Sequence, residues 1–94
     1  MKYDIEKLQT WYADNCDGEW EHFSGVRIET LDNPGWRVTV DLEGTVSERK
    51  EFTTVSIERS CDNWCYCTVK DGKFRGAGGP KNLSEILEIF QKWA

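Results

Sequence analysis

Two strand-like runs joined by a tight turn constrain the fold of this chain more than any other stretch. The second run, residues 36–42, alternates strictly between apolar and polar side chains, and its apolar members are Trp36, Val38, Val40 and Leu42. This period of two is typical of a strand with one buried face. The first run is Gly25 to Leu31, and Asp32-Asn33-Pro34-Gly35 separates the two. Because proline presets φ and glycine accepts a positive φ in such a turn, the stretch predicts an antiparallel hairpin.

Further strand-like runs extend the sheet beyond this hairpin. Phe52 to Arg59 is the third predicted strand, and Trp64 to Lys70 is the fourth. Asp71-Gly72 is a tight-turn pair, which makes Lys73 to Arg75 a short fifth strand. Because the connections are short, we expect an antiparallel meander. The fourth strand carries two different faces, one with Cys65, Cys67 and Val69 and the other with Trp64, Tyr66 and Thr68.

A helix is predicted at each end of the chain. Residues 3–14 and Leu83 to Trp93 both carry apolar side chains at helical spacing. Asn82 is the expected N-cap of the second helix, where Glu85 completes a capping-box pattern, and a glycine loop at residues 76–80 precedes it. The order predicts one α+β domain over residues 1–94. It has an N-terminal helix, a meander of four to five strands and a C-terminal helix, with both helices packed on one sheet face.

Charge and composition restrict the partners. The net charge is −5, and all of it falls in residues 1–50, which carry eleven acidic and six basic side chains. A negative field disfavours nucleic acid and anionic membranes and favours a basic protein surface. The start, MKYDIEKLQTW, lacks the apolar region of a signal peptide, and no run of about 18 apolar residues is present. We therefore expect a cytoplasmic chain whose four cysteines are reduced.

The most polar stretch is Cys16 to Ser24, which we expect to be an extended loop carrying Asp17, Glu19, Glu21 and His22. These carboxylates can form a solvated acidic face or a patch for a basic protein partner. They can also serve a divalent cation or acid–base chemistry. Cys16 and His22 are a conceivable nucleophile and base, which keeps open a small metal-binding or thiol-dependent enzyme. No oxyanion donor or known metal-ligand pattern accompanies them.

Three other features permit a functional interpretation. The spacing of Cys61, Cys65 and Cys67 is not that of a zinc site, so these are expected to be reduced, mostly buried thiols. The glycines at residues 76–79 precede a helix and can bind an anion or simply form a turn. Trp20, Trp36 and Trp64, with Tyr66, exceed what a small core needs, so some are expected to be partly exposed interface anchors.

The motif W-Y-x-x-x-C-D-G-x-W-E-H at residues 11–22, followed by T-L-D-N-P-G-W at residues 30–36, closely resembles the immunity protein 53 family of bacterial polymorphic-toxin systems. The run VSIERS, then Trp64, then the ending KFRGAGGPKNLSEILEIFQKW extend the resemblance over nearly the whole chain. The resemblance implies a cytoplasmic, non-enzymatic antitoxin that binds the catalytic domain of a secreted toxin encoded beside it. The family pattern is matched by Trp11, Cys16, Asp17, Gly18, Trp20, Glu21, His22, Gly25, Asp32, Asn33, Pro34, Gly35, Trp36, Gly76, Gly78, Gly79, Pro80 and Asn82.

Together, the residues and the resemblance favour inhibition by binding. The hypothesis is that an acidic and aromatic surface occludes the active site of a basic toxin domain, such as a nuclease. The expected partner-binding residues are Asp17, Glu19, Trp20, Glu21, His22, Asp32 and Trp36. No catalytic, cofactor or metal-binding residue is predicted. The chain is expected to be a monomer or a weak homodimer that associates through an uncovered sheet face.

Overall fold

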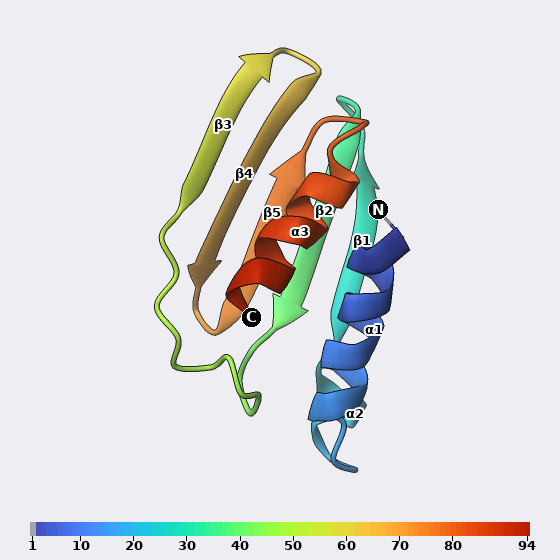
Figure 1. Ribbon diagram of the computed structural model, residues 1–94, viewed down its shortest axis with the longest axis vertical. Coiled ribbons are helices and arrows are strands. Elements are labelled where there is room, and N and C mark those ends of the chain that lie inside the picture. The colour runs from blue at the N-terminus through green and yellow to red at the C-terminus, as the bar shows by residue number, and fades with distance from the viewer. Residues whose placement is uncertain (1) are drawn as a thin grey trace.

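The alternating run at residues 36–42 forms most of β2 (Gly35–Asp41), and the side chains on its inner face belong to the core. The computed structural model describes the backbone of residues 2–94 and the side chains of residues 5–94, and in it Val38, Val40 and the following Leu42 are fully buried. The predicted α+β class is confirmed (Figure 1). The other elements are α1 (Lys2–Asn15), α2 (Trp20–Phe23), β1 (Val26–Leu31), β3 (Val55–Ser60), β4 (Asn63–Lys70), β5 (Lys73–Gly78) and α3 (Leu83–Trp93).

The five strands form one antiparallel sheet in the order β1-β2-β5-β4-β3, so the predicted meander order is wrong. After β2 the chain runs through residues 42–54 to the far edge of the sheet, where it forms β3 (Figure 1). Two tight turns then bring β4 and β5 back until β5 pairs with β2. The connection at residues 42–54 is long enough to cross the sheet, which the prediction did not consider.

The last strand is longer than predicted, because Gly76 and Gly78 lie in β5 and not in a loop. Gly78 pairs with Trp36 of β2 and with Cys65 of β4. A Cβ atom at Gly78 would lie 3.2 Å from Cδ1 of Ile86, and one at Gly76 would overlap Cγ2 of the same side chain. These glycines therefore let a helix approach the centre of the sheet closely.

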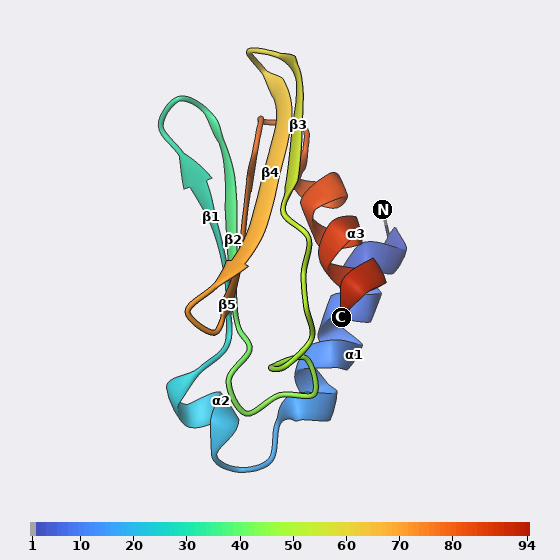
Figure 2. The same ribbon diagram turned by 90° about the vertical axis from the view of Figure 1, so that its left-hand side faces the viewer.

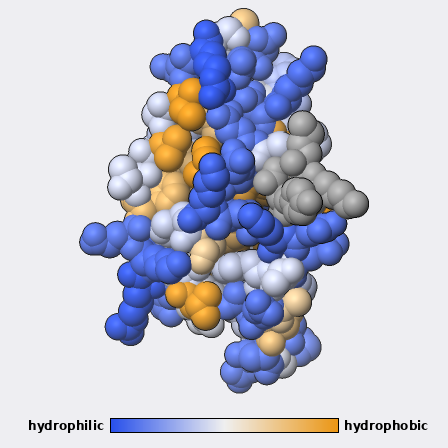
Figure 3. Space-filling model, viewed as in Figure 1, coloured by the Kyte–Doolittle hydropathy of each residue, from blue (hydrophilic) through white to orange (hydrophobic). Residues whose placement is uncertain are grey.

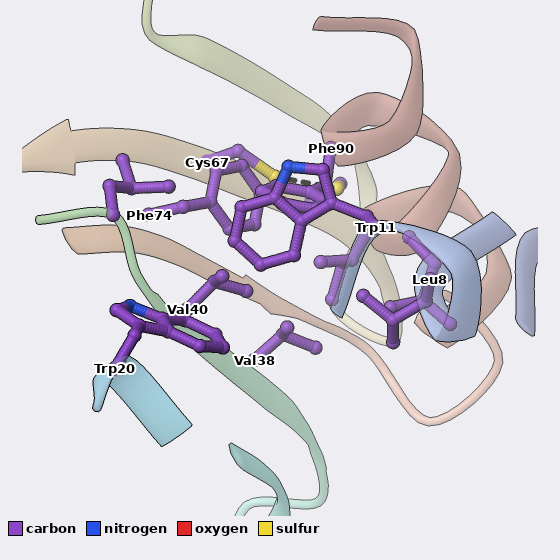
Figure 4. Packing of buried hydrophobic residues seen from close by; sticks show 12 residues of the cluster. Leu8, Trp11, Trp20, Val38, Val40, Cys67, Phe74 and Phe90 are labelled. Atoms are coloured by element: carbon purple, nitrogen blue, oxygen red, sulfur yellow. Dashed lines mark hydrogen bonds between the residues drawn. The ribbon is translucent and has the colours of Figure 1, made fainter. Parts of the chain in front are cut away.

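Both helices lie on one face of the sheet, as predicted (Figure 2). α3 packs over the central strands, and α1 packs beside α3. Phe90 of α3 joins the layers, because its ring centroid lies 5.1 Å from that of Trp11 in α1 and 5.0 Å from that of Phe74 in β5 (Figure 4). Such edge-to-face contacts add to the burial of the rings in stabilising the core.

The start of α3 differs from the capping box that the sequence predicted. Asn82 occupies the N-cap position, but its side chain accepts no hydrogen bond from the helix. Its amide donates to Asn63 and to Glu85, each at 3.0 Å. The carboxylate of Glu85 is drawn instead to Arg59 of β3, whose two guanidinium nitrogens lie 3.0 and 2.7 Å from its oxygens. Asn82 and Glu85, the residues of the expected capping box, thus connect α3 to β4 and β3.

The surface that carries the helices is mainly hydrophilic, with hydrophobic side chains gathered over β3 and β4 (Figure 3). Neither α1 nor α3 covers the opposite face of the sheet (Figure 2). Within residues 2–94, none of the helices combines the length and apolarity that a transmembrane span requires.

Candidate functional site

Residues 16–24 form a turn and a one-turn helix, so the extended loop that the sequence predicted is wrong. Oδ1 of Asp17 accepts hydrogen bonds from the backbone N–H groups of Glu19 and Trp20, both at 2.9 Å. The carboxylate of Glu21 accepts from the N–H groups of Asp17 (2.9 Å) and Gly18 (2.8 Å). Gly18 has a φ of +92°, which glycine adopts without strain. The two carboxylates thus fold the stretch by binding the backbone beside them.

These hydrogen bonds favour the ionised form of both carboxylates. The N–H group of Trp20, followed by that of Glu19, lowers the pKa of Asp17. The N–H groups of Glu21 itself, Asp17 and Gly18 lower the pKa of Glu21. An ionised carboxylate is the stronger acceptor for an N–H donor, so charge and local structure support each other.

The first and last residues of α2, Trp20 and Phe23, are both aromatic but differ in exposure. Trp20 is only 7% exposed, and its ring centroid lies 5.9 Å from that of Trp11 (Figure 4). Trp20 therefore fixes α2 to the core, and its small exposed part lines a hollow beside Glu19. Phe23 is 90% exposed, and the sequence analysis did not single it out. A one-turn helix leaves no periodic pattern, so nothing in the sequence shows which of the two rings is buried.

The connection after β2 brings further carboxylates to α2. Its backbone is held by α1, because Oδ1 of Asn15 accepts from the N–H group of Val46 at 3.2 Å. The side chain of Trp11 donates to Oγ of Ser47 at 3.4 Å. Glu48 accepts from the N–H group of Gly44 at 3.2 Å, which shapes the tip of this connection. The sequence did not predict that this connection lies beside α2, because its position depends on contacts between residues far apart in the chain.

The result is a cluster of carboxylates at one end of the molecule, which we call the acidic end. A shallow hollow of about 290 Å³ there is lined by Asp17, Glu19 and Glu43 together with Phe23. Residues 14–24 and 42–48 contain no lysine or arginine. The field at this end is therefore negative without a basic side chain of these segments to neutralise it. The acidic end consists of Asp17, Glu19, Glu21 and Glu43.

The other two predicted partner-binding residues lie at the opposite end. Asp32 is exposed in the turn between β1 and β2, and β1 separates it from α2 (Figure 1). Trp36, the second residue of β2, is half-buried beside this turn, and its Nε1 donates to the carbonyl oxygen of Pro80 at 2.9 Å. The structure thus brings Asp17, Glu19, Trp20, Glu21 and His22 together and leaves Asp32 and Trp36 as a separate group.

The comparison with known families supports one of the classes of protein that these features permit. The sequence model of the family described as immunity protein 53 matches residues 5–94, nearly the whole chain. The chain belongs to this family. No curated protein and no solved structure matched it. The resemblance that the sequence motifs indicated is therefore confirmed.

Membership in an immunity-protein family favours a binding role over catalysis. The geometry around Cys16 offers no observation in favour of the thiol-dependent alternative. The Sγ atom of Cys16 donates to the carbonyl oxygen of Tyr12 at 3.2 Å, and the side chain of His22 is exposed at the end of α2. No hydrogen bond joins Cys16 and His22 among the described residues.

The remaining cysteines of this immunity protein lie along β4 and beside it. Cys65 and Cys67 are buried, as predicted, with their sulfur atoms 3.8 Å apart, whereas Cys61 is exposed. The contact with Cys65, together with burial, raises the pKa of the Cys67 thiol. Among the residues whose side chains are described, no three His, Cys, Asp or Glu residues are grouped so that they could hold a metal ion.

Proposed function

We propose that this immunity protein binds the catalytic domain of a cognate toxin in the cytoplasm of the producing cell and neutralises it by covering its active site. Membership in the immunity protein 53 family supports the general role. The observation that carries the surface assignment is the acidic end, a group of mostly exposed carboxylates without a basic neighbour in its own segments. The partner with matching chemistry is a basic toxin domain, such as a nuclease.

The residues of the acidic end contribute in different ways. Glu19 and Glu43 are exposed and line the same hollow, so they supply charge directly to a partner. Asp17 and Glu21 supply charge and also maintain the turn through their hydrogen bonds to the backbone. Trp20 acts from beneath, because its burial fixes α2.

Three further residues complete the proposed contact set. His22 is exposed on α2, beside the acidic residues. Asp32 and Trp36 supply a separate contact at the β1–β2 turn, which only a partner that spans the length of β1 reaches together with the acidic end. Opposite charge on the two surfaces accelerates encounter and orients the complex.

The proposal is tested with the toxin domain encoded beside this gene. Co-expression is expected to restore growth, and the purified domains are expected to form a one-to-one complex by light scattering. For the surface assignment, Glu19→Lys with Glu43→Lys is compared with Glu6→Lys and Glu88→Lys, which make the same charge change at exposed positions of α1 and α3. Titration calorimetry at low salt is expected to show a dissociation constant raised at least about tenfold by the first pair only.

Each outcome has a defined meaning. Absence of both binding and rescue by the unaltered chain contradicts the proposed function. A complex that both double variants weaken equally leaves the function standing and rejects the acidic end as the contact surface. Raising the salt concentration is expected to shrink the difference between the two pairs, because exposed charges are screened within about 8–10 Å at physiological ionic strength.

A further inference from the structure

The outer face of the sheet, opposite the helices, concentrates basic side chains in a chain that is acidic overall. Arg27 of β1 pairs with Thr39 of β2, which pairs with Arg75 of β5, so the three side chains form one row across neighbouring strands. Their neighbours Val38 and Val40 point to the buried face, and the row therefore points away from the helices. The charges come together only through the strand register.

The basic side chains of this face differ in what they contact. Nη1 of Arg37 lies 3.8 Å from Oε2 of Glu29, and Lys73 forms an ion pair with Asp41. Asp41 also accepts a hydrogen bond from the N–H group of Gly25 at 2.9 Å. Burial raises the pKa of Asp41, but the bonds from Lys73 and Gly25 outweigh it and the net effect is a lowered pKa. Two arginines, Arg27 and Arg75, have no ion-pair partner among the side chains that the structure describes.

These side chains surround a hollow of about 440 Å³. Four basic side chains line it, those of Arg27, Arg37, Lys73 and Arg75, together with Thr39 and Phe23. Two carboxylates, Glu29 and Asp41, also line it, and they are paired with Arg37 and Lys73. Phe23 also lines the smaller hollow of the acidic end, so it lies between two surfaces of opposite charge. An aromatic side chain that is 90% exposed gains little from folding, and such rings beside arginines are typical of interface anchors.

We propose that this hollow receives a carboxylate side chain from an acidic segment of the toxin domain, with Phe23 packed against the apolar surface beside it. This inference rests on the proposed function, because it names a second contact surface for the same partner. Arginine is suited to the role, since its planar guanidinium donates two parallel hydrogen bonds to a carboxylate. Arg27 and Arg75 flank Thr39, whose hydroxyl adds a further donor between them.

A carboxylate from a protein fits this face better than nucleic acid. The whole chain carries a net charge of −5, and the acidic end adjoins the hollow through Phe23. A continuous strand of phosphates would extend over those carboxylates and be repelled. A single acidic side chain enters the hollow without approaching the acidic end, and the carboxylates of Glu29 and Asp41 in the hollow are already paired with Arg37 and Lys73. The partner therefore places its own basic region against the acidic end and its own acidic region against the outer sheet face. These two contacts fix its orientation.

The test uses the full chain and the toxin domain encoded beside its gene, made catalytically inactive. Arg27→Gln with Arg75→Gln removes the two arginines that form no ion pair with a described side chain. Lys7→Gln with Lys92→Gln removes the same charge from exposed positions of the helices. Phe23→Ala is the third variant. Titration calorimetry is expected to show a dissociation constant raised at least about tenfold by the arginine pair and by Phe23→Ala, and changed less than about threefold by the lysine pair. Circular dichroism and urea unfolding establish that each variant is folded.

The outcomes separate this inference from the proposed function. Equal effects of the arginine and lysine pairs, or tighter binding by the arginine pair, overturn the carboxylate site while the immunity function stands. Weaker binding by the arginine pair with no effect of Phe23→Ala supports the carboxylate site and rejects Phe23 as the anchor. Failure of the unaltered chain to bind the toxin domain overturns both proposals.

Discussion

Gly76 of β5 lies directly beneath Ile86 of α3, so close that a Cβ atom at position 76 would overlap Cγ2 of the isoleucine. The same Cβ would lie 3.2 Å from Cε2 of Phe74 and 3.3 Å from the sulfur of Cys67. The site is thus closed on three sides by fully buried side chains. The absence of a side chain at position 76 sets the distance between the last helix and the sheet.

Gly76→Ala is expected to lower the free energy of unfolding by about 1–3 kcal/mol, because an overpacked core must shift its backbone or adopt strained rotamers. Gly25→Ala is the matched control, since a Cβ at position 25 meets no atom within 4 Å. Urea unfolding followed by tryptophan fluorescence measures both variants. Equal midpoints for the two would show that α3 adjusts to the added methyl group at no cost.

Phe90 and Phe23 provide a second contrast, between two phenylalanines of opposite environment. Phe90 is fully buried in the aromatic cluster, and Phe23 is 90% exposed. Phe90→Ala is expected to cost about 3–5 kcal/mol, the range for deleting a buried aromatic side chain. Phe23→Ala is expected to stay within about 0.5 kcal/mol of the parent chain. A large loss of stability in Phe23→Ala would mean that its ring has a structural role, which would weaken its assignment as an interface anchor.

The turn before α2 gives the chain a defined response to acid. The folded-state pKa values of Asp17 and Glu21 are lowered by backbone hydrogen bonds, and in an unfolded chain these groups titrate near pH 4. Their contribution to stability is therefore present above about pH 4 and is lost as the pH falls through the folded pKa values. Unfolding by urea between pH 6 and about pH 3 is expected to show this loss.

The double variant Asp17→Asn with Glu21→Gln is expected to have a flatter dependence on pH over the same range. Glu19→Gln is the control, because the carboxylate of Glu19 makes no hydrogen bond with any side chain or backbone group that the structure describes. Slopes that are the same in the double variant and the control would show that other carboxylates, such as Asp41 and Glu85, account for the sensitivity to acid.

Local sequence patterns predicted the elements of this fold better than their arrangement. The alternation at Val38, Val40 and Leu42 identified the central buried strand, and the strand was found where it was expected. The pattern failed at Gly76 and Gly78, because glycine indicates a loop unless its neighbours in space are known. The strand order could not be derived from short-range signals, since it depends on where the long connection at residues 42–54 ends.

For the candidate surfaces too, local patterns revealed charges that are adjacent in the chain but not those that folding brings together. The acidic stretch at residues 17–21 was visible in the sequence because its charges are adjacent in the chain. Glu43 joins it only through the packing of a distant connection. Arg27 and Arg75 are far apart in sequence and become neighbours through their common partner Thr39, so no local pattern could have indicated the basic hollow.

A final prediction concerns the ion pair between Arg59 of β3 and Glu85 of α3, which ties an edge strand to the helix layer. The two nitrogens of the guanidinium lie 3.0 and 2.7 Å from the two carboxylate oxygens. The side chains are 45% and 26% exposed, so solvent screens part of their attraction. A double-mutant cycle with Arg59→Met and Glu85→Gln is therefore expected to give a coupling energy of about 0.5–1 kcal/mol.

The coupling is also expected to depend on pH. The bond from Arg59 is the main cause of the lowered pKa of Glu85, so the coupling is present above about pH 4 and lost as Glu85 is protonated below it. Glu88→Gln serves as control, because Glu88 lies on the same helix and contacts only Lys92 at 3.9 Å among the ion pairs of the described side chains. Faster amide hydrogen exchange in β3 of Glu85→Gln, and not of Glu88→Gln, would locate the effect at the strand. Coupling that persists at pH 3 would mean that the contact is held by packing and not by charge.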